Sequence, residues 1–152
     1  MSHRIAAALA AALFATLALP APAAEHAKVG ARPTAPQAAK NRIVIQINED
    51  DGKKWMAVLA NIKNIQAELG QRNVAIAVVA IGAGLGMLAA DSIAANEVED
   101  AIKTGVEFIA CGNSMTAQKV APEDLVAGSQ IAKAGYVEIM RRQQAGWTYL
   151  RP

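Results

Sequence analysis

The side chain with the most chemical potential in this sequence is the thiol of Cys111, the only cysteine among its 152 residues. It follows a mostly apolar run, residues 106–110, which is typical of a buried strand. Open α/β sheets place their ligand crevices at the carboxyl ends of the strands, so this position favours a reactive thiol. Gly112, Asn113 and Ser114 come next, and their N–H groups would stabilise the thiolate and lower the thiol pKa if a helix begins there.

Other uses of this cysteine stay open from its position alone. A buried cysteine often packs as a small hydrophobe, and a single cysteine can also pair between two chains. The only histidines are His3 and His26, close to the N-terminus. A Ser-His-Asp or Cys-His hydrolase is therefore disfavoured, as is a structural zinc site, and we expect neither a metal nor a cofactor.

A glycine-rich segment offers a second candidate for chemistry. Residues 84–89 match the Gly-x-Gly-x-x-Ala form of the dinucleotide-binding motif. The motif follows the second expected strand rather than the first, and no Lys or Ser/Thr stands where a phosphate-binding loop would place it. We interpret the segment as a tight strand-to-helix crossing, in which Gly82 and Gly84 help to close a pocket around Cys111.

The N-terminal residues have the pattern of a secretory signal peptide, which we place at 1–24. A short basic head precedes an apolar run, residues 5–19, and small residues follow it at 20–24. The run is shorter than the roughly 20 residues that a transmembrane helix needs. We therefore expect a periplasmic protein with no membrane attachment after cleavage, an Ala- and Pro-rich flexible leader at 25–40, and a single domain at 41–152.

Composition restricts the partners of that domain. The formal net charge is +2, and acidic and basic residues are mixed along the chain rather than grouped. Nucleic acids and anionic membranes are bound by concentrated basic surfaces, so neither is an expected partner.

The apolar patterns predict an alternation of strands and helices. Strands are expected at 43–47, 74–81, 106–110, 129–132 and 147–150, and helices at 53–69, 96–104, 113–118 and 136–144. This order is typical of a three-layer α/β/α sandwich on a mainly parallel sheet of about five strands.

Several residues are expected to begin, end or orient these elements. Asp51 and Asn113 are predicted N-caps, Asn96 and Glu99 a capping box, and Gly70, Gly105 and Gly146 helix stops. In the last helix we expect Tyr136, Ile139 and Met140 to face inward, and Arg141 and Arg142 to face solvent. Trp147 and Tyr149 are expected to pack in the core or at a subunit interface.

Four segments, 42–48, 82–85, 105–115 and 143–152, resemble the DsrE/DsrF-like family of sulfur-relay proteins, which have the YchN-like fold. The resemblance implies a three-layer α/β/α domain, assembly into trimers or hexamers, and a cysteine that carries sulfur as a persulfide, here Cys111. Relatives often have a His where this chain has Ile81, and Arg-Gly where it has Gln118 and Lys119. The sulfur carriers of the family work in the cytoplasm, whereas this chain carries an export signal.

These observations predict a periplasmic sulfur-handling protein, a carrier or sulfurtransferase, that holds sulfur as a persulfide on Cys111. Its expected partners are further copies of itself and sulfur donors and acceptors, either proteins or small sulfane-sulfur compounds. The alternative is a non-catalytic oligomeric binding or scaffold domain in which the cysteine is structural. A redox sensor that forms an interchain disulfide is a third possibility.

Overall fold

The computed structural model describes residues 41–152, so the predicted signal peptide, 1–24, and leader, 25–40, lie outside the described residues. The strands are β1 Asn41–Ile47, β2 Val74–Ala80, β3 Glu107–Cys111, β4 Gln130–Ala132 and β5 Thr148–Leu150. The α-helices are α1 Gly52–Leu69, α2 Ala95–Lys103, α3 Gly112–Gln118 and α4 Gly135–Gln144. Each predicted element is present, with ends that differ by a few residues at most.

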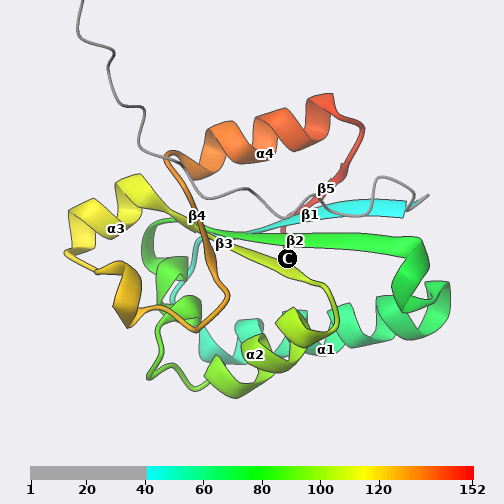
Figure 1. The fold of residues 1–152 in the computed structure, drawn as a ribbon, viewed down its shortest axis with the longest axis horizontal. Coiled ribbons are helices and arrows are strands. Elements are labelled where there is room, and N and C mark those ends of the chain that lie inside the picture. Colours follow the sequence, from blue (N-terminus) through cyan, green and yellow to red (C-terminus); the bar gives the residue numbers. More distant parts are fainter. Residues whose placement is uncertain (1–40) are drawn as a thin grey trace, which may run out of the picture. The chain divides into compact units, whose positions relative to one another are not determined.

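The five strands form one sheet in the order β4-β3-β2-β1-β5, and every neighbouring pair is parallel. Figure 1 shows α1 and α2 together on one face of this sheet and α4 on the other. The predicted three-layer α/β/α sandwich is confirmed. Within residues 41–152, no helix is both long enough and apolar enough to cross a membrane.

Each face of the sheet has its own apolar core, because side chains alternate between faces along a strand. On the α1 and α2 face, Ile45, Ile47 and Phe108 belong to the larger cluster. The smaller cluster lies on the α4 face and includes Val44, Ala77, Val79, Ile81, Ile109, Cys111 and Ile139. Cys111 therefore projects toward α4.

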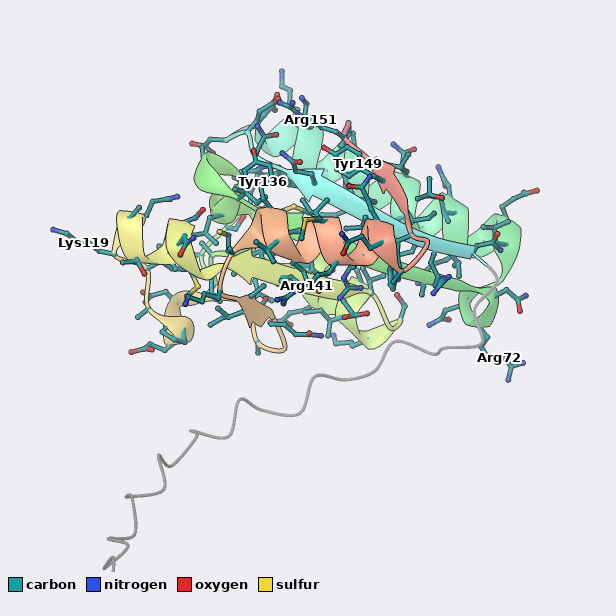
Figure 2. The ribbon with its side chains drawn as sticks, turned by 90° about the horizontal axis from the view of Figure 1, so that it is seen from above. Arg72, Lys119, Tyr136, Arg141, Tyr149 and Arg151 are labelled. Atoms are coloured by element: carbon teal, nitrogen blue, oxygen red, sulfur yellow. The ribbon has the colours of Figure 1, made fainter. Side chains whose placement is uncertain are left out.

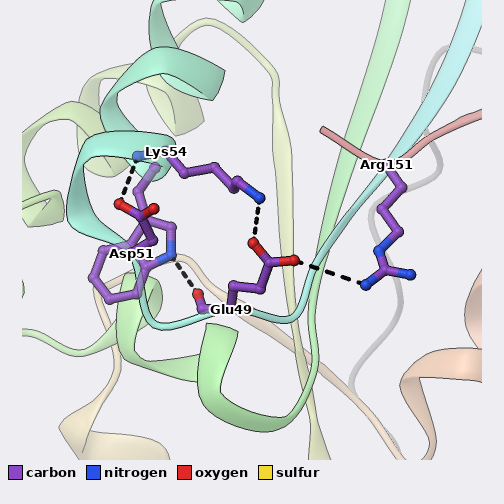
Figure 3. Close-up of polar contacts among 5 residues, drawn as sticks. Glu49, Asp51, Lys54 and Arg151 are labelled. Atoms are coloured by element: carbon purple, nitrogen blue, oxygen red, sulfur yellow. Dashed lines mark hydrogen bonds and ion pairs between the residues drawn. The ribbon is translucent and has the colours of Figure 1, made fainter.

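The loop between β1 and α1 is fixed by a small polar network (Figure 3). Asp51 is the N-cap of α1, as predicted, and its carboxylate accepts a hydrogen bond from the Lys54 N–H at 3.1 Å. The Trp55 indole donates to the Glu49 carbonyl at 2.9 Å. The Glu49 carboxylate pairs with the Lys54 ammonium and with the Arg151 guanidinium. The network ties the end of β1 to the residue that follows β5.

The start of α2 differs from the prediction. The predicted capping box is wrong, because α2 begins at Ala95 with Ala94 as its N-cap residue. Successive turn bonds precede this start, including Ala95 N–H to the Ser92 carbonyl at 3.0 Å, so the chain is already coiled before Asn96. The predicted helix stops Gly70, Gly105 and Gly146 all have positive φ, a backbone conformation that favours glycine.

Helix α4 turns a different face to the sheet than its apolar residues predict. Tyr136 and Met140, predicted inward, are 63% and 48% exposed, whereas Arg142, predicted outward, is only 8% exposed. Ile139 is buried and Arg141 is exposed, as predicted. Figure 2 looks onto this helix and labels Tyr136 and Arg141, two of its exposed side chains.

Arg142 is drawn inward by two carboxylates. It binds both oxygens of Glu107 on β3, at 2.8 and 3.3 Å, and one oxygen of Glu138, one turn earlier on α4, at 3.0 Å. Its guanidinium also lies 4.4 Å from the centre of the Trp147 ring. Trp147 and Tyr149 pack against the smaller core cluster, and the Tyr149 hydroxyl bonds to the buried Gln46 amide at 2.7 Å. Core packing was one of the two roles predicted for these aromatic residues.

Candidate functional site

Cys111 occupies the junction between β3 and α3. The strand ends at Cys111 and the helix begins at Gly112, so the cysteine is itself the N-cap residue. The predicted N-cap, Asn113, is wrong, because the chain passes from strand to helix with no turn residue between them. The first N–H groups of α3 have no partner within the helix. Those of Asn113 and Ser114 act on the sulfur and lower the thiol pKa, and the Asn113 N–H also donates to the Lys133 carbonyl at 3.2 Å.

A second helix also begins at this sulfur. Gly135 is the first residue of α4, and its N–H donates to Cys111 Sγ at 3.2 Å. A side chain at Gly135 has no room, since its Cβ would lie 2.7 Å from Ile81 Cγ1 and 3.1 Å from Cys111 Cβ. The positive ends of two helices therefore converge on one thiol. Our sequence analysis missed Gly135; the only signal was a glycine directly before a predicted helix.

The side chain of Ser114 adds a further hydrogen bond to the sulfur. Its oxygen accepts the N–H of Gly82 at 2.8 Å, which leaves the hydroxyl proton free to point at Cys111. The Gly82 carbonyl in turn accepts from the Gln118 side chain at 2.7 Å. The loop after β2 is thus fastened to α3 beside the thiol, and the placing of Gly82 agrees with the predicted pocket.

The other two predicted glycines do not line the pocket. Gly84 packs on the end of β1 instead, where an added Cβ would lie 2.5 Å from the Ile47 carbonyl oxygen. This contact explains the glycine as a close backbone crossing, the interpretation made from the sequence. Gly112 begins α3, and its Cβ position faces the Ala132 carbonyl at 3.3 Å.

Cys111 opens into a cavity of about 310 Å³. The cavity is lined by Ile81, Gly82, Cys111, Asn113, Ser114, Ala117, Gln118, Ala134, Gly135 and Tyr136. The cysteine is only 4% exposed, so a reagent has to enter this cavity to meet the sulfur. A cavity of about 390 Å³ lies elsewhere, lined in part by Ile45, Val58 and Leu150, and contains none of these residues.

The surroundings of Cys111 favour its ionised form. Burial raises the pKa of the thiol, but four hydrogen bonds oppose this effect and together lower the pKa below its ordinary value. The bonds come from the Ser114 hydroxyl and from the N–H groups of Gly135, Ser114 and Asn113. A larger thiolate fraction at neutral pH makes the sulfur a better nucleophile at that pH. The direction is the one expected from the sequence.

Among residues 41–152, no group of three or more His, Cys, Asp or Glu side chains is arranged to hold a metal ion.

The Ser114→Ala substitution is expected to raise the pKa of Cys111, because a donor to the thiolate is lost and the Gly82 N–H loses its acceptor. The check is the rate of Cys111 alkylation by iodoacetamide against pH. For the wild type we expect a midpoint below that of an ordinary cysteine thiol, and for the variant a higher one. The Thr116→Ala variant is the matched control, since the Thr116 hydroxyl, on the same helix, donates to the Gly112 carbonyl at 3.0 Å. Equal midpoints for wild type and Ser114→Ala would contradict this account.

Comparisons with known proteins place the fold and the family. The structure matches MTH1491 from Methanobacterium thermoautotrophicum, a protein of unknown function, with a TM-score of 0.71. The two chains are 36% identical, and the match covers 74% of this chain and 99% of MTH1491. This chain belongs to the same family as MTH1491. No family model matches the sequence, and no curated protein matches it either.

Two more distant structures share the fold of this family. The match to BT1422 from Bacteroides thetaiotaomicron, a conserved protein of unknown function, has a TM-score of 0.62 at 15% identity, and covers 76% of this chain and 98% of BT1422. The match to the YchN protein from E. coli has a TM-score of 0.60 at 13% identity, and covers 74% of this chain and 99% of YchN. The YchN-like fold predicted from the sequence is therefore present.

Proposed function

We propose that this protein is a sulfur carrier of the DsrE/DsrF-like type, which holds a sulfur atom as a persulfide on Cys111. The observation that carries the proposal is the thiol itself: it lies in a cavity, its pKa is lowered, and two helices begin at its sulfur. A cysteine that only packs needs none of these donors. The YchN-like fold is consistent with a sulfur-relay function.

The proposed reaction needs one cysteine and no cofactor. The Cys111 thiolate attacks the outer sulfur of a persulfide donor, R–S–SH; the new S–S bond to Cys111 forms as the donor's own S–S bond breaks, and the electron pair leaves with R–S⁻. Cys111 then carries the group as Cys–S–SH. An acceptor thiolate attacks the outer sulfur in the same way, receives it, and returns Cys111 to the thiolate form. No net oxidation occurs in either step.

The hydrogen-bond donors around Cys111 suit the negative charge that its sulfur carries in this cycle. The thiolate is present before loading and again after release, and N–H groups stabilise it in both states. The cycle needs no side chain as a general base, because a larger fraction of this thiol is ionised at neutral pH than of an ordinary cysteine thiol.

The setting of this chemistry is part of the proposal. The predicted signal peptide at 1–24 would deliver the domain to the periplasm, where donors and acceptors differ from those of cytoplasmic carriers. The exposed side chains of α4, Tyr136, Val137 and Met140, provide apolar surface of the kind that subunits bury in a homo-oligomer.

The sensor alternative has less support from the geometry. An interchain disulfide requires two Cα atoms within about 7 Å of each other. Cys111 is 4% exposed inside its cavity, which keeps a second copy's cysteine away from that distance. The scaffold alternative, with a structural cysteine, is the hypothesis that the sulfur-loading test has to exclude.

Purified protein treated with polysulfide is expected to gain sulfur atoms in its intact mass, and a reductant should remove them. The Cys111→Ala variant is expected to gain none, because it lacks the attacking thiolate. Thiosulfate in a parallel reaction tests a second sulfane-sulfur donor, and transfer to an added acceptor thiol tests release.

The scaffold hypothesis predicts that the protein gains no sulfur. It is supported, and the carrier is excluded, if the wild-type protein gains no sulfur from either donor and the folded protein resists alkylation. A reducible covalent dimer on a non-reducing gel would instead favour the sensor.

A further inference from the structure

Strand β3 and helix α4 are tied to each other at both ends. At the carboxyl end of the strand, Cys111 Sγ accepts the N–H of Gly135. At its amino end, Glu107 binds the guanidinium of Arg142 through both oxygens. The strand and helix therefore run in opposite directions, with one tie at the thiol and the other at an ion pair.

The ion pair between Arg142 and Glu107 is buried, together with Glu138. The side chains of Glu107, Glu138 and Arg142 are all at most one tenth exposed. Burial alone would lower the pKa of Arg142, but the bonds to Glu107 and Glu138 raise it, which keeps the guanidinium charged. A planar guanidinium that spans both carboxylates fixes the height and rotation of α4 over β3 more closely than an apolar contact does.

Arg142 is too far from the thiol to act on it by charge alone. It lies seven residues after Gly135 on α4, which is about 10 Å along the helix axis. Salt screens a buried charge little, but the carboxylates of Glu107 and Glu138 beside the guanidinium offset its charge at that distance. Any strong effect of Arg142 on Cys111 therefore passes through the position of α4.

The ionisable groups around the thiol are few. Tyr136 of α4 lines its cavity, and Glu107 lies four residues earlier on β3. Lys119 after α3 and Lys133 after β4 are exposed. Glu138 and Arg142 complete the set on α4.

We propose that Arg142 is a positioning residue for Cys111: its bonds to Glu107 hold α4 at the height where the Gly135 N–H reaches the sulfur. The inference rests on the proposed function, since it explains how the carrier thiol is kept ready. The positioning role is tested on the reactivity of the thiol, without sulfur transfer, so the positioning role and the carrier function can fail separately.

The experiment measures the alkylation rate of Cys111 against pH in four variants, with thermal melting of each. In Arg142→Met and in Glu107→Met the tie is broken, and the pH midpoint is expected to rise, with the rate at neutral pH falling roughly three- to tenfold, as for loss of a typical hydrogen bond. Arg142→Lys keeps the charge but not the two-oxygen contact, and should fall between these and wild type. Arg141→Met is the matched control, because Arg141 is the exposed neighbour on the same helix.

Glu107→Met gives the sharpest outcome. If Glu107 acted on the thiol by charge, its removal would lower the midpoint; if it acts by holding α4, its removal raises it. This variant leaves Arg142 paired with Glu138, so it also serves where Arg142→Met does not fold. An unchanged or lowered midpoint in Glu107→Met overturns the proposal, and so does a lowered melting temperature with an unmoved midpoint. Polysulfide loading of the wild type is scored separately: its failure would remove the proposed function and leave the alkylation result standing.

Discussion

The Gly135→Ala substitution is expected to raise the pKa of Cys111 and to slow its alkylation at neutral pH by up to about tenfold. The added methyl group would lie 2.7 Å from Ile81 Cγ1 and 3.1 Å from Cys111 Cβ, closer than carbon atoms normally approach, so we expect the start of α4 to move away from the sheet. That movement lengthens the 3.2 Å contact between the Gly135 N–H and the sulfur. A stability loss of about 1–3 kcal/mol is expected as well, the usual cost of overpacking.

The partner that causes the clash provides the control. In the double variant Gly135→Ala, Ile81→Ala, the space taken by the new methyl group is returned, and the pH midpoint is expected to move back toward the wild-type value. The Ile81→Ala single variant completes the cycle and measures the coupling between the two residues. A Gly135→Ala protein with a wild-type pH profile would show that the Gly135 N–H does not stabilise the thiolate.

The Gly84→Ala substitution is expected to destabilise the fold by at least about 2 kcal/mol, toward the upper part of the range for overpacked sites. Its Cβ would meet backbone rather than a side chain: the Ile47 carbonyl oxygen at 2.5 Å and the Asn48 nitrogen at 2.7 Å. The same Ile47 carbonyl accepts the Ile81 N–H at 2.8 Å, so the displacement breaks a bond between the ends of β1 and β2. Thermal melting should show a fall of roughly 8 °C or more.

Gly86 offers a matched comparison in the same segment. Its Cβ would lie 3.2 Å from the outer edge of the Trp55 ring, a side chain that can shift by a few tenths of an ångström. Gly86→Ala is therefore expected to cost less than Gly84→Ala. If Gly86→Ala were the more damaging of the two, the close backbone crossing would not be what requires a glycine at position 84.

The layered fold was predictable because its strongest signals are local. The continuous apolar run of β2 predicts a strand covered on both faces, and all its residues are buried. The apolar period of α1, with Asp51 before it and Gly70 after it, predicts both ends of that helix. Alternation of such elements is sufficient to indicate a parallel sheet.

The orientation of α4 was not predictable from apolar spacing, because its buried stripe is partly charged. Gly135, Glu138, Ile139 and Arg142 follow the helical spacing i, i+3, i+4 and i+7, but only Ile139 is a large apolar residue. The stripe is buried because Glu107, inside a strand on the same face, requires a cation. The sequence shows Glu107 within an apolar run, yet only the fold brings it to Arg142.

Only the part of the thiol site that is close to Cys111 in the sequence was predictable. The N–H groups of α3 follow Cys111 directly in the chain, so they were expected near its sulfur. The N–H of Gly135 comes from a segment 24 residues away, and reaches the sulfur because α4 packs on the face of the sheet toward which Cys111 projects. Such a contact depends on tertiary packing and leaves no local pattern.

The place of β5 beside β1 has a consequence for how the protein folds. Ile43 pairs with Thr148 and Ile45 with Leu150, so β1 gains its outer neighbour only after a loop of nearly the whole described chain has closed. Contacts between such distant segments slow folding, because the entropy of loop closure is lost before the contacts form. During synthesis, β1 keeps an open edge until residues 148–150 follow, and an open edge invites pairing with another chain. We therefore expect refolding to be slow and sensitive to protein concentration.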